Sequence, residues 1–195
     1  MGKLAAPARP RLTSLNHSFT LDLVICSRGK AAEALVTMRD MMTRLKLTVN
    51  ETKTRVCKVP EEKFDFLGYT FGRCYSPKTG RAYLGTTPSK KRVQRICQAI
   101  SEATGRNKTQ QAFEQLVAQL NRQMIGWANY FCLGPVRKAY SAVERHTCRR
   151  LRQWLCAKHK RKGAGTKRYS DQLLHDKFGL VRLNGRTVSL PWARP

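Results

Sequence analysis

The sequence predicts an α+β fold, in which a small antiparallel sheet is followed by a mainly α-helical part. Short runs rich in aromatic and β-branched residues fall mostly within the first 87 residues. From residue 88 onward, apolar residues recur at helical spacing over long stretches. The chain has 195 residues, 41% of them hydrophobic, which suffices to bury one ordinary core or two small ones without disulfides.

The first elements are an arm, a strand and a helix. Residues 1–18 show no periodicity and are expected to form a flexible N-terminal arm. The apolar run 23–26 predicts a short buried strand. A helix is expected from Lys30, because apolar residues at spacings of three, four and seven make one stripe: Ala31, Ala34, Leu35, Met38, Met41, Met42 and Leu45.

Residues 48–87 are expected to form a small antiparallel meander. The alternating, β-rich run 48–58 predicts one strand, and 64–71 predicts a second. The sequence SPKTG at 76–80 has turn chemistry and leads into the β-rich pair 83–84.

The remaining chain is expected to be helical. Residues 88–103 predict one helix, with Thr87 as its N-cap and Pro88 in its first position. A second helix is expected from Thr109 and a long third helix over 136–160. Their expected inner faces are Phe113, Leu116, Val117, Leu120 and Met124 in the second, and Val136, Tyr140, Val143, Thr147, Leu151, Trp154 and Leu155 in the third.

The last 26 residues are expected to add a short helix and a hairpin. The helix is predicted over 170–177. The hairpin is predicted from runs at 180–183 and 187–190, which turn at Asn184-Gly185.

The net charge indicates a polyanionic partner. The chain carries 38 basic and 12 acidic residues, a net charge of +26. Residues 1–87 hold fifteen basic and seven acidic residues, a net of +8, whereas residues 88–195 hold twenty-three and five, a net of +18. Nucleic acid is the usual partner for such a charge. A cationic membrane-surface protein would instead need a strongly amphipathic helix with large exposed apolar side chains.

The cysteine pattern indicates free thiols rather than a disulfide framework or a metal site. The seven cysteines form no CxxC pair. Cys148, Cys156 and His159 are the closest approach to a ligand set, but buried small side chains are the simpler interpretation. Free thiols, with neither a signal core nor an apolar run long enough to span a membrane, predict a cytoplasmic protein with no membrane partner.

The predicted long helix and its tail carry cations of one sign. Between Val136 and Arg168 the only acid is Glu144. Solvated helix faces normally mix charges, so this clustering favours contact with phosphates. The basic residues are Arg137, Lys138, Arg145, Arg149, Arg150, Arg152, Lys158, Lys160, Arg161, Lys162, Lys167 and Arg168.

Five segments of the chain resemble one family. They read KFDFLGYTF (63–71), SPKTGR (76–81), TPSKKRVQRI (87–96), LNRQMIGWANYF (120–131) and VRKAYSAVERHTCRRLRQWLCAKHK (136–160). They closely resemble the C-terminal half of bacterial group II intron-encoded reverse transcriptase/maturases, proteins of mobile elements, over about residues 19–183. The resemblance implies a palm remnant at 19–87, a helical thumb or maturase-specific X domain at 88–178, and a short hairpin or tail at 179–195.

The resemblance also implies that the polymerase site is incomplete. FTLDLVIC at 19–26 stands where the family has Tyr-Ala-Asp-Asp, so Leu21 replaces the first, metal-binding aspartate and Asp22 is a vestigial second one. Two-metal phosphoryl transfer requires clustered carboxylates. The fingers and the first half of the palm are missing as well. No metal site and no cofactor is therefore expected in this chain, although full-length members use Mg²⁺.

Other positions match the family better. Lys53 corresponds to a lysine near the incoming triphosphate, although a solvated lysine is the simpler interpretation without the metal site. Leu67, Gly68 and Tyr69 resemble the primer grip, where glycine allows close approach of backbone. Trp127 and Tyr130 could stack on bases, but their helical spacing favours a place in the core.

The residues expected to contact nucleic acid combine this turn with the basic helices. They are Leu67, Gly68, Tyr69, Lys90, Lys91, Arg92, Arg95, Arg137, Lys138, Arg149, Arg150, Arg152, Lys158, Lys160, Arg161, Lys162, Lys167 and Arg168.

Three hypotheses about function remain open at this point. The favoured one is a truncated maturase that binds structured intron RNA and assists splicing without polymerase activity. The alternative is one part of an RNA-directed DNA polymerase, active on template-primer only when its missing N-terminal half is supplied in trans. The third is a degenerate product that does not fold stably alone, because missing strands would expose a sheet edge.

Overall fold

The computed structural model describes residues 22–76, 78–184 and 186. The chain divides into two compact units, with the boundary between Leu47 and Thr48. The expected palm remnant at 19–87 includes residues of both units, and its assignment stays a prediction. None of the helices in the described ranges combines the length and apolar character that crossing a membrane requires.

The first unit contains one helix, α1 (Ala31–Arg44), which confirms the helix expected from Lys30. Met38 is its buried side chain, whereas Met41 and the following Leu45 are exposed. The sequence therefore predicts the helix correctly, and the other residues of the expected apolar stripe are half-buried.

The strand expected at 23–26 is wrong. These residues have no regular secondary structure, and Leu23, Val24 and Ile25 are exposed. A strand requires a hydrogen-bonding neighbour. None of the sheet pairings found in the described residues involves this run. Its apolar character alone does not produce a strand.

The strand expected at 48–58 is also wrong, because Asn50 organises a turn there. Its carbonyl oxygen accepts hydrogen bonds from the backbone N–H groups of Lys53 (3.1 Å) and Thr54 (3.0 Å). Its side-chain Oδ1 accepts from the hydroxyl of Thr52 at 2.7 Å. Asparagine and threonine offer the backbone such local bonds in competition with a sheet ladder.

The second unit begins with a three-stranded antiparallel meander, ordered β1-β2-β3. It consists of β1 (Phe64–Phe66), β2 (Tyr69–Tyr75) and β3 (Ala82–Pro88). The strand expected over 64–71 is therefore two strands. The turn at Leu67-Gly68 separates them, and both residues have positive φ, 50° and 85°. Two positive φ values are what the tightest hairpin turns require.

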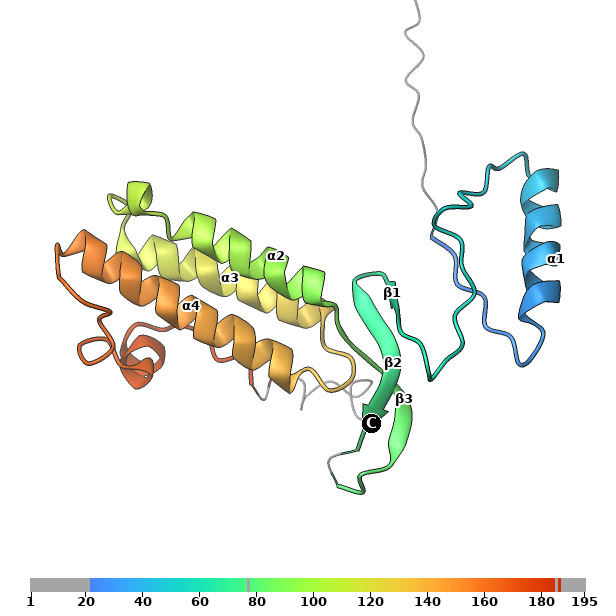
Figure 1. Ribbon diagram of the computed structural model, residues 1–195. Coiled ribbons are helices and arrows are strands. Elements are labelled where there is room, and N and C mark those ends of the chain that lie inside the picture. The colour runs from blue at the N-terminus through green and yellow to red at the C-terminus, as the bar shows by residue number, and fades with distance from the viewer. Residues whose placement is uncertain (1–21, 77, 185, 187–195) are drawn as a thin grey trace, which may run out of the picture. The chain divides into compact units, whose positions relative to one another are not determined.

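Three helices follow the sheet and lie side by side, as Figure 1 shows. They are α2 (Lys90–Ala103), α3 (Phe113–Tyr130) and α4 (Arg137–Lys158), and α3 runs antiparallel to the other two. A short 3₁₀ helix, η1 (Arg106–Lys108), joins α2 to α3.

The expected start of α2 is wrong by two residues. Ser89 is the N-cap, and its hydroxyl accepts from the backbone N–H of Arg92 at 3.4 Å. Thr87 and Pro88 instead end β3, where Pro88 pairs with Tyr69. The second expected helix likewise begins at Phe113 rather than at Thr109.

The inner faces of the helices form one core, as expected. The fully buried side chains include Ile100, Leu116, Leu120, Met124, Tyr140, Leu151 and Trp154. The buried polar atoms of Tyr140 and Trp154 both have hydrogen-bond partners. The hydroxyl of Tyr140 donates to Ala128 O at 2.8 Å, and Trp154 Nε1 donates to Lys108 O at 3.2 Å.

The last described segment packs back on the bundle. It contains the single-turn π-helix η2 (Leu173–Lys177), which confirms the short helix expected near 170–177. Residues 180–183 do not form a strand. The carboxylate of Glu144 accepts from the backbone N–H groups of Leu183 and Asn184. The rest of the expected hairpin, Gly185 and 187–190, lies outside the described residues.

The α+β fold class is confirmed, because a small antiparallel sheet is followed by a mainly helical part.

Candidate nucleic-acid interface

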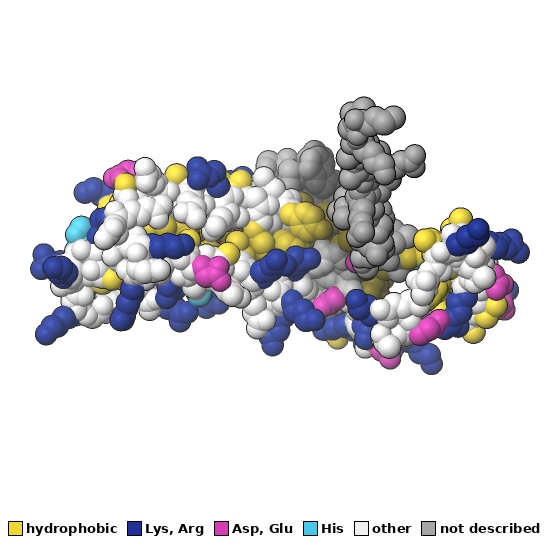
Figure 2. Space-filling view, turned by 90° about the horizontal axis from the view of Figure 1, so that it is seen from above, with side chains coloured by type: hydrophobic (Ala, Val, Ile, Leu, Met, Phe, Trp, Pro, Cys, Tyr) yellow, Lys and Arg dark blue, Asp and Glu magenta, His cyan; other side chains and the backbone are white. Residues whose placement is uncertain are grey.

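The exposed cations of α4 share one side of the helix. Lys138, Arg145 and Arg149 are separated by seven and four residues, so they follow one another along the face opposite the buried side chains. All three are exposed. Arg145 Nε donates to Ser141 O at 3.2 Å within its own helix. Figure 2 shows many Lys and Arg side chains and few Asp and Glu side chains over the helical part.

The segment after α4 continues this basic surface. Its cations Lys160, Arg161, Lys162, Lys167 and Arg168 are exposed. The segment is nevertheless attached to the bundle. The Arg161 backbone N–H donates to Cys156 O at 2.7 Å, and a Cβ on Gly165 would lie 2.6 Å from Cys156 Sγ.

Arg150 has an intramolecular role that the sequence does not reveal. It is half-buried, and its guanidinium donates to Ser101 O (2.9 Å), Thr104 O (3.1 Å) and Thr104 Oγ1 (3.0 Å). These oxygens belong to the last turn and C-cap of α2, where unpaired carbonyls and the helix dipole favour a cation. Arg150 therefore fastens α2 to α4.

Arg152 and Lys158 also have internal partners. Arg152 donates to Tyr169 O at 2.6 Å and pairs with Asp171, which holds the segment before η2 against α4. Lys158 Nζ donates to Thr109 O (3.0 Å) and Gln111 O (2.8 Å) and lies 5.0 Å from the centre of the Trp154 ring. The expected RNA contacts of these two residues and of Arg150 stay predictions.

The cations of α2 and the first turn of α4 are exposed as expected: Lys90, Lys91, Arg92, Arg95 and Arg137.

His146 adds no strong positive charge to the interface between α2 and α4. Its Nε2 lies 2.9 Å from Ser101 Oγ. Burial, together with the charge of Arg149, lowers the pKa of His146 below its ordinary value.

The turn at Leu67-Gly68 is fastened to the helical bundle. The Tyr130 hydroxyl donates to Leu67 O at 3.0 Å, and the Ser89 backbone N–H donates to Gly68 O at 2.9 Å. In the opposite direction, the Tyr69 hydroxyl donates to Tyr130 O at 2.6 Å. Burial raises the pKa of Tyr69, so it remains a hydroxyl donor.

The glycine in this turn has a packing reason within the chain. A Cβ at Gly68 would lie 2.9 Å from Arg92 Nε and 3.1 Å from Phe131 Cζ. The close approach expected for a primer strand is thus made here by the protein's own helices. A primer contact at Leu67, Gly68 and Tyr69 stays a prediction, and of these three only the Leu67 side chain is well exposed, at 56%.

Among the expected aromatic residues, Trp127 packs in the bundle, with its ring centre 5.1 Å from Phe131 and 5.9 Å from Tyr140. Tyr130 is 56% exposed. Its ring could therefore contact a ligand while its hydroxyl holds the turn.

The residues expected near a polymerase site are exposed. Asp22 has no regular secondary structure, and Lys53 lies in the Asn50 turn. Leu21 lies outside the described residues. Within the described ranges, no group of three or more His, Cys, Asp or Glu side chains is placed to hold a metal ion. Cys148 and Cys156 are buried, and burial raises the pKa of Cys148 to about 12.

Arg145 lies in the basic cluster recognised from the sequence but is not among the residues expected to contact nucleic acid. Arg145 belongs to the same face as Lys138 and Arg149, and the helical spacing of four residues to Arg149 is the signal that identifies it.

One comparison with known protein families matches the helical part of the chain. The family model of the group II intron, maturase-specific domain matches residues 93–172, which reach from α2 through α3 and α4 to the segment before η2. A search of curated proteins finds no match. The resemblance predicted for the helical part is confirmed, because residues 93–172 match the model of the group II intron, maturase-specific domain.

Proposed function

We propose that this protein binds structured group II intron RNA through the exposed cations of α4 and its tail, and thereby assists splicing. The observation that carries the proposal is the single-sign row Lys138, Arg145 and Arg149, continued by the five exposed cations at 160–168. The side chains of Lys138, Lys160 and Lys162 have no hydrogen bond or ion pair within the described residues, so they are available to phosphates.

The packing of the bundle supports this use of the surface. Arg150, Arg152 and Lys158 hold the three helices and the tail together from the same helix that displays the exposed cations. The exposed charges therefore project from a fixed scaffold. A-form RNA presents little sequence information through its deep groove, so such a surface recognises phosphate positions and shape.

The test is fluorescence anisotropy with a labelled group II intron RNA at increasing salt. If the protein makes six to ten phosphate contacts, raising the salt concentration from low to moderate should weaken binding by roughly 10³- to 10⁵-fold. Replacing Lys138, Arg145 and Arg149 together by methionine should make the slope of log K against log salt shallower by about 2 to 3. Affinity that does not respond to salt, or a slope unchanged in the triple variant, would contradict the proposal.

The contribution to splicing requires its own assay. Added protein should increase the rate of splicing of an intron RNA under conditions where the RNA alone reacts slowly, and the triple variant should increase it less. An unrelated structured RNA of similar length serves as the control for shape-independent binding. Equal affinity for both RNAs, with no effect on the splicing rate, would leave only non-specific binding.

We further propose that the chain does not polymerise DNA. The support is Leu21, whose aliphatic side chain offers no oxygen to a divalent cation, whereas the two-metal mechanism requires clustered carboxylates. A primer-extension assay tests this, with the protein alone and with an added N-terminal half of a related polymerase. Incorporation by the wild-type chain in either arm would refute the proposal. Leu21→Asp in the second arm is the matched variant.

A further inference from the structure

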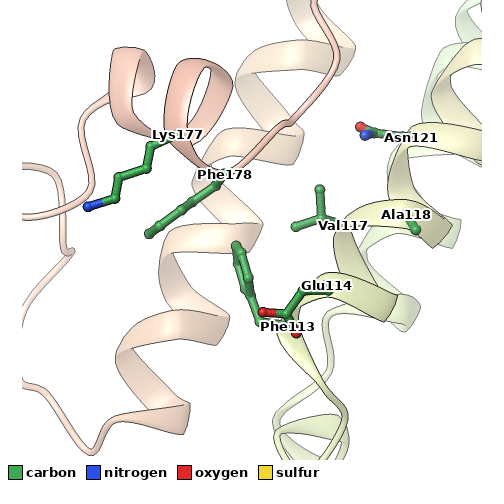
Figure 3. Close-up of a pocket in the computed structure, with 7 residues that line it drawn as sticks. All are labelled: Phe113, Glu114, Val117, Ala118, Asn121, Lys177 and Phe178. Carbon is green, nitrogen blue, oxygen red and sulfur yellow. The ribbon is translucent and has the colours of Figure 1, made fainter.

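An open pocket lies between α3 and the end of η2 (Figure 3). Its volume is about 470 Å³, and its lining includes Phe113, Glu114, Ala118 and Asn121 of α3 together with Lys177 and Phe178 at the end of η2. Figure 3 shows the two phenylalanine rings between α3 and this terminal segment.

The aromatic wall of the pocket is fixed by packing. The ring centres of Phe113 and Phe178 are 4.8 Å apart in an edge-to-face arrangement. Phe113 also contacts Trp154, and Phe178 contacts Tyr169, with ring centres 6.3 and 6.4 Å apart. Both phenylalanines are only half-buried, so they present an ordered apolar surface to a ligand.

The amide of Asn121 holds one wall of the pocket in place. Its Nδ2 donates to Gly179 O at 2.8 Å, and its Oδ1 accepts from the Val181 backbone N–H at 2.9 Å. These bonds hold the chain after Phe178 against α3. Two exposed charged groups then remain in the lining, Glu114 and Lys177. In Figure 3 the Lys177 side chain extends away from Glu114.

Glu114 differs from the other acidic residues of this part of the chain. From residue 88 onward there are five acids. Glu102 accepts from Gln98, Glu144 binds the backbone at 183–184, and Asp171 and Asp176 pair with arginines. Glu114 alone has no hydrogen bond or ion pair among the described residues. Its place in the first turn of α3 accounts for its stability there, but not for its position beside an aromatic wall.

We propose that this pocket binds an unpaired guanine base of the RNA ligand. The inference rests on the RNA binding proposed above. An unpaired base can stack on the phenylalanine surface while Lys177 contacts the strand's phosphate. A carboxylate has two acceptor oxygens, and guanine presents two adjacent donors, N1–H and the N2 amino group, on its Watson–Crick edge. Adenine and cytosine present one amino group there, and uracil presents only its N3–H.

The charge of the surroundings favours a nucleic acid over a peptide in this pocket. Residues 88–195 have a net charge of +18, which attracts a polyanion, and phosphate contact by Lys177 is consistent with that field. A carboxylate within such a surface weakens general phosphate binding, so Glu114 is better explained by specific recognition of a base that carries donors.

The test compares single-stranded heptamers of uridine that carry guanosine, adenosine, cytidine or uridine at the central position. Binding of the full chain is measured by fluorescence anisotropy at one low salt concentration. The guanosine heptamer should bind about fivefold or more tightly than the all-uridine one. Adenosine and cytidine should give intermediate affinities.

Two surface variants test the pocket without removing core side chains. Glu114→Gln should abolish the preference for guanosine while leaving all-uridine binding equal or slightly tighter. Ala118→Leu should fill the pocket and reduce the preference, with all-uridine binding and thermal melting unchanged. Persistence of the preference in both variants would overturn the proposal.

The failure of this inference is distinguishable from failure of the proposed function. Equal, salt-dependent affinity for all four heptamers would reject the guanine pocket, as expected if the pocket accepts a protein side chain instead, and would leave general RNA binding intact. Absence of binding to every heptamer and to intron RNA would reject both.

Discussion

Replacing Arg150 by methionine is expected to destabilise the helical bundle, whereas the same replacement at Arg149 is expected to weaken RNA binding. The two arginines are adjacent in α4 but differ in environment. Arg150 donates to Ser101 O, Thr104 O and Thr104 Oγ1 at 2.9, 3.1 and 3.0 Å. Arg149 is exposed, and among the described residues its guanidinium has one hydrogen-bond partner, His146 Nδ1, at 3.4 Å.

The size of the effect follows from these contacts. A hydrogen bond from a charged group contributes about 1.5–3 kcal/mol, and a cation at a helix C-terminus about 0.3–1 kcal/mol. The bonds of Arg150 are not additive, so Arg150→Met should lower the free energy of unfolding by about 2–4 kcal/mol. For a chain of this size, that corresponds to a decrease in Tm of roughly 5–15 °C. Arg149→Met should change stability by about 0.5 kcal/mol or less.

The assay combines thermal melting by circular dichroism with salt-dependent RNA anisotropy for both variants. Arg149→Met should reduce the salt slope by about 0.7–0.9 and leave Tm unchanged. Arg150→Met should lower Tm, with a smaller change in slope measured well below its melting transition. Equal Tm values for Arg150→Met and the wild type would refute the structural role. A cooperative melt of the wild type would also argue against a chain that cannot fold alone.

Three further predictions concern packing and pH. Gly134→Ala should lower the free energy of unfolding by more than about 2 kcal/mol, because the added Cβ would lie 2.1 Å from Thr86 O and the backbone has a φ of +75°. Gly163→Ala is the control, since the space around its Cβ is open, and it should cost only about 1–2 kcal/mol. Urea denaturation measures both. Tyr140→Phe should lower the free energy of unfolding by about 1–2 kcal/mol, because the carbonyls of Ala128 and Phe131 lose their hydroxyl donor. In the wild type, burial raises the pKa of Tyr140 to about 12, so ultraviolet absorbance should show this hydroxyl ionising only near pH 12. Burial lowers the pKa of His146 in the folded state below its ordinary value of 6.5. As pH decreases through about 6.5, the unfolded state therefore takes up a proton first, and the free energy of unfolding falls. His146→Gln should flatten that decrease, and an unchanged pH profile of stability would contradict the prediction.

The sequence predicts most of the helical part because helical periodicity is local. The buried faces of α3 and α4 match the expected residues, from Leu116 and Leu120 to Leu151 and Trp154. The expected strands at 23–26 and 48–58 are wrong, because β-like composition there does not produce strands. A strand depends on a neighbour for its hydrogen bonds, and Asn50 provides local bonds that compete with pairing.

By itself, the sequence determines that this chain is strongly basic, that it has an α+β fold with amphipathic helices, and that its helical part resembles a maturase-specific domain. These properties depend on composition, spacing and local motifs. Only the tertiary structure decides which cations face solvent. Arg149 and Arg150 are neighbours in the sequence, yet only Arg150 donates hydrogen bonds to the C-terminus of α2, 46 residues away. The pocket also depends on tertiary structure, because Phe113 and Phe178 meet only when the terminal segment folds back on α3. Long side chains find partners across the fold, and those partners have no signature in the local sequence.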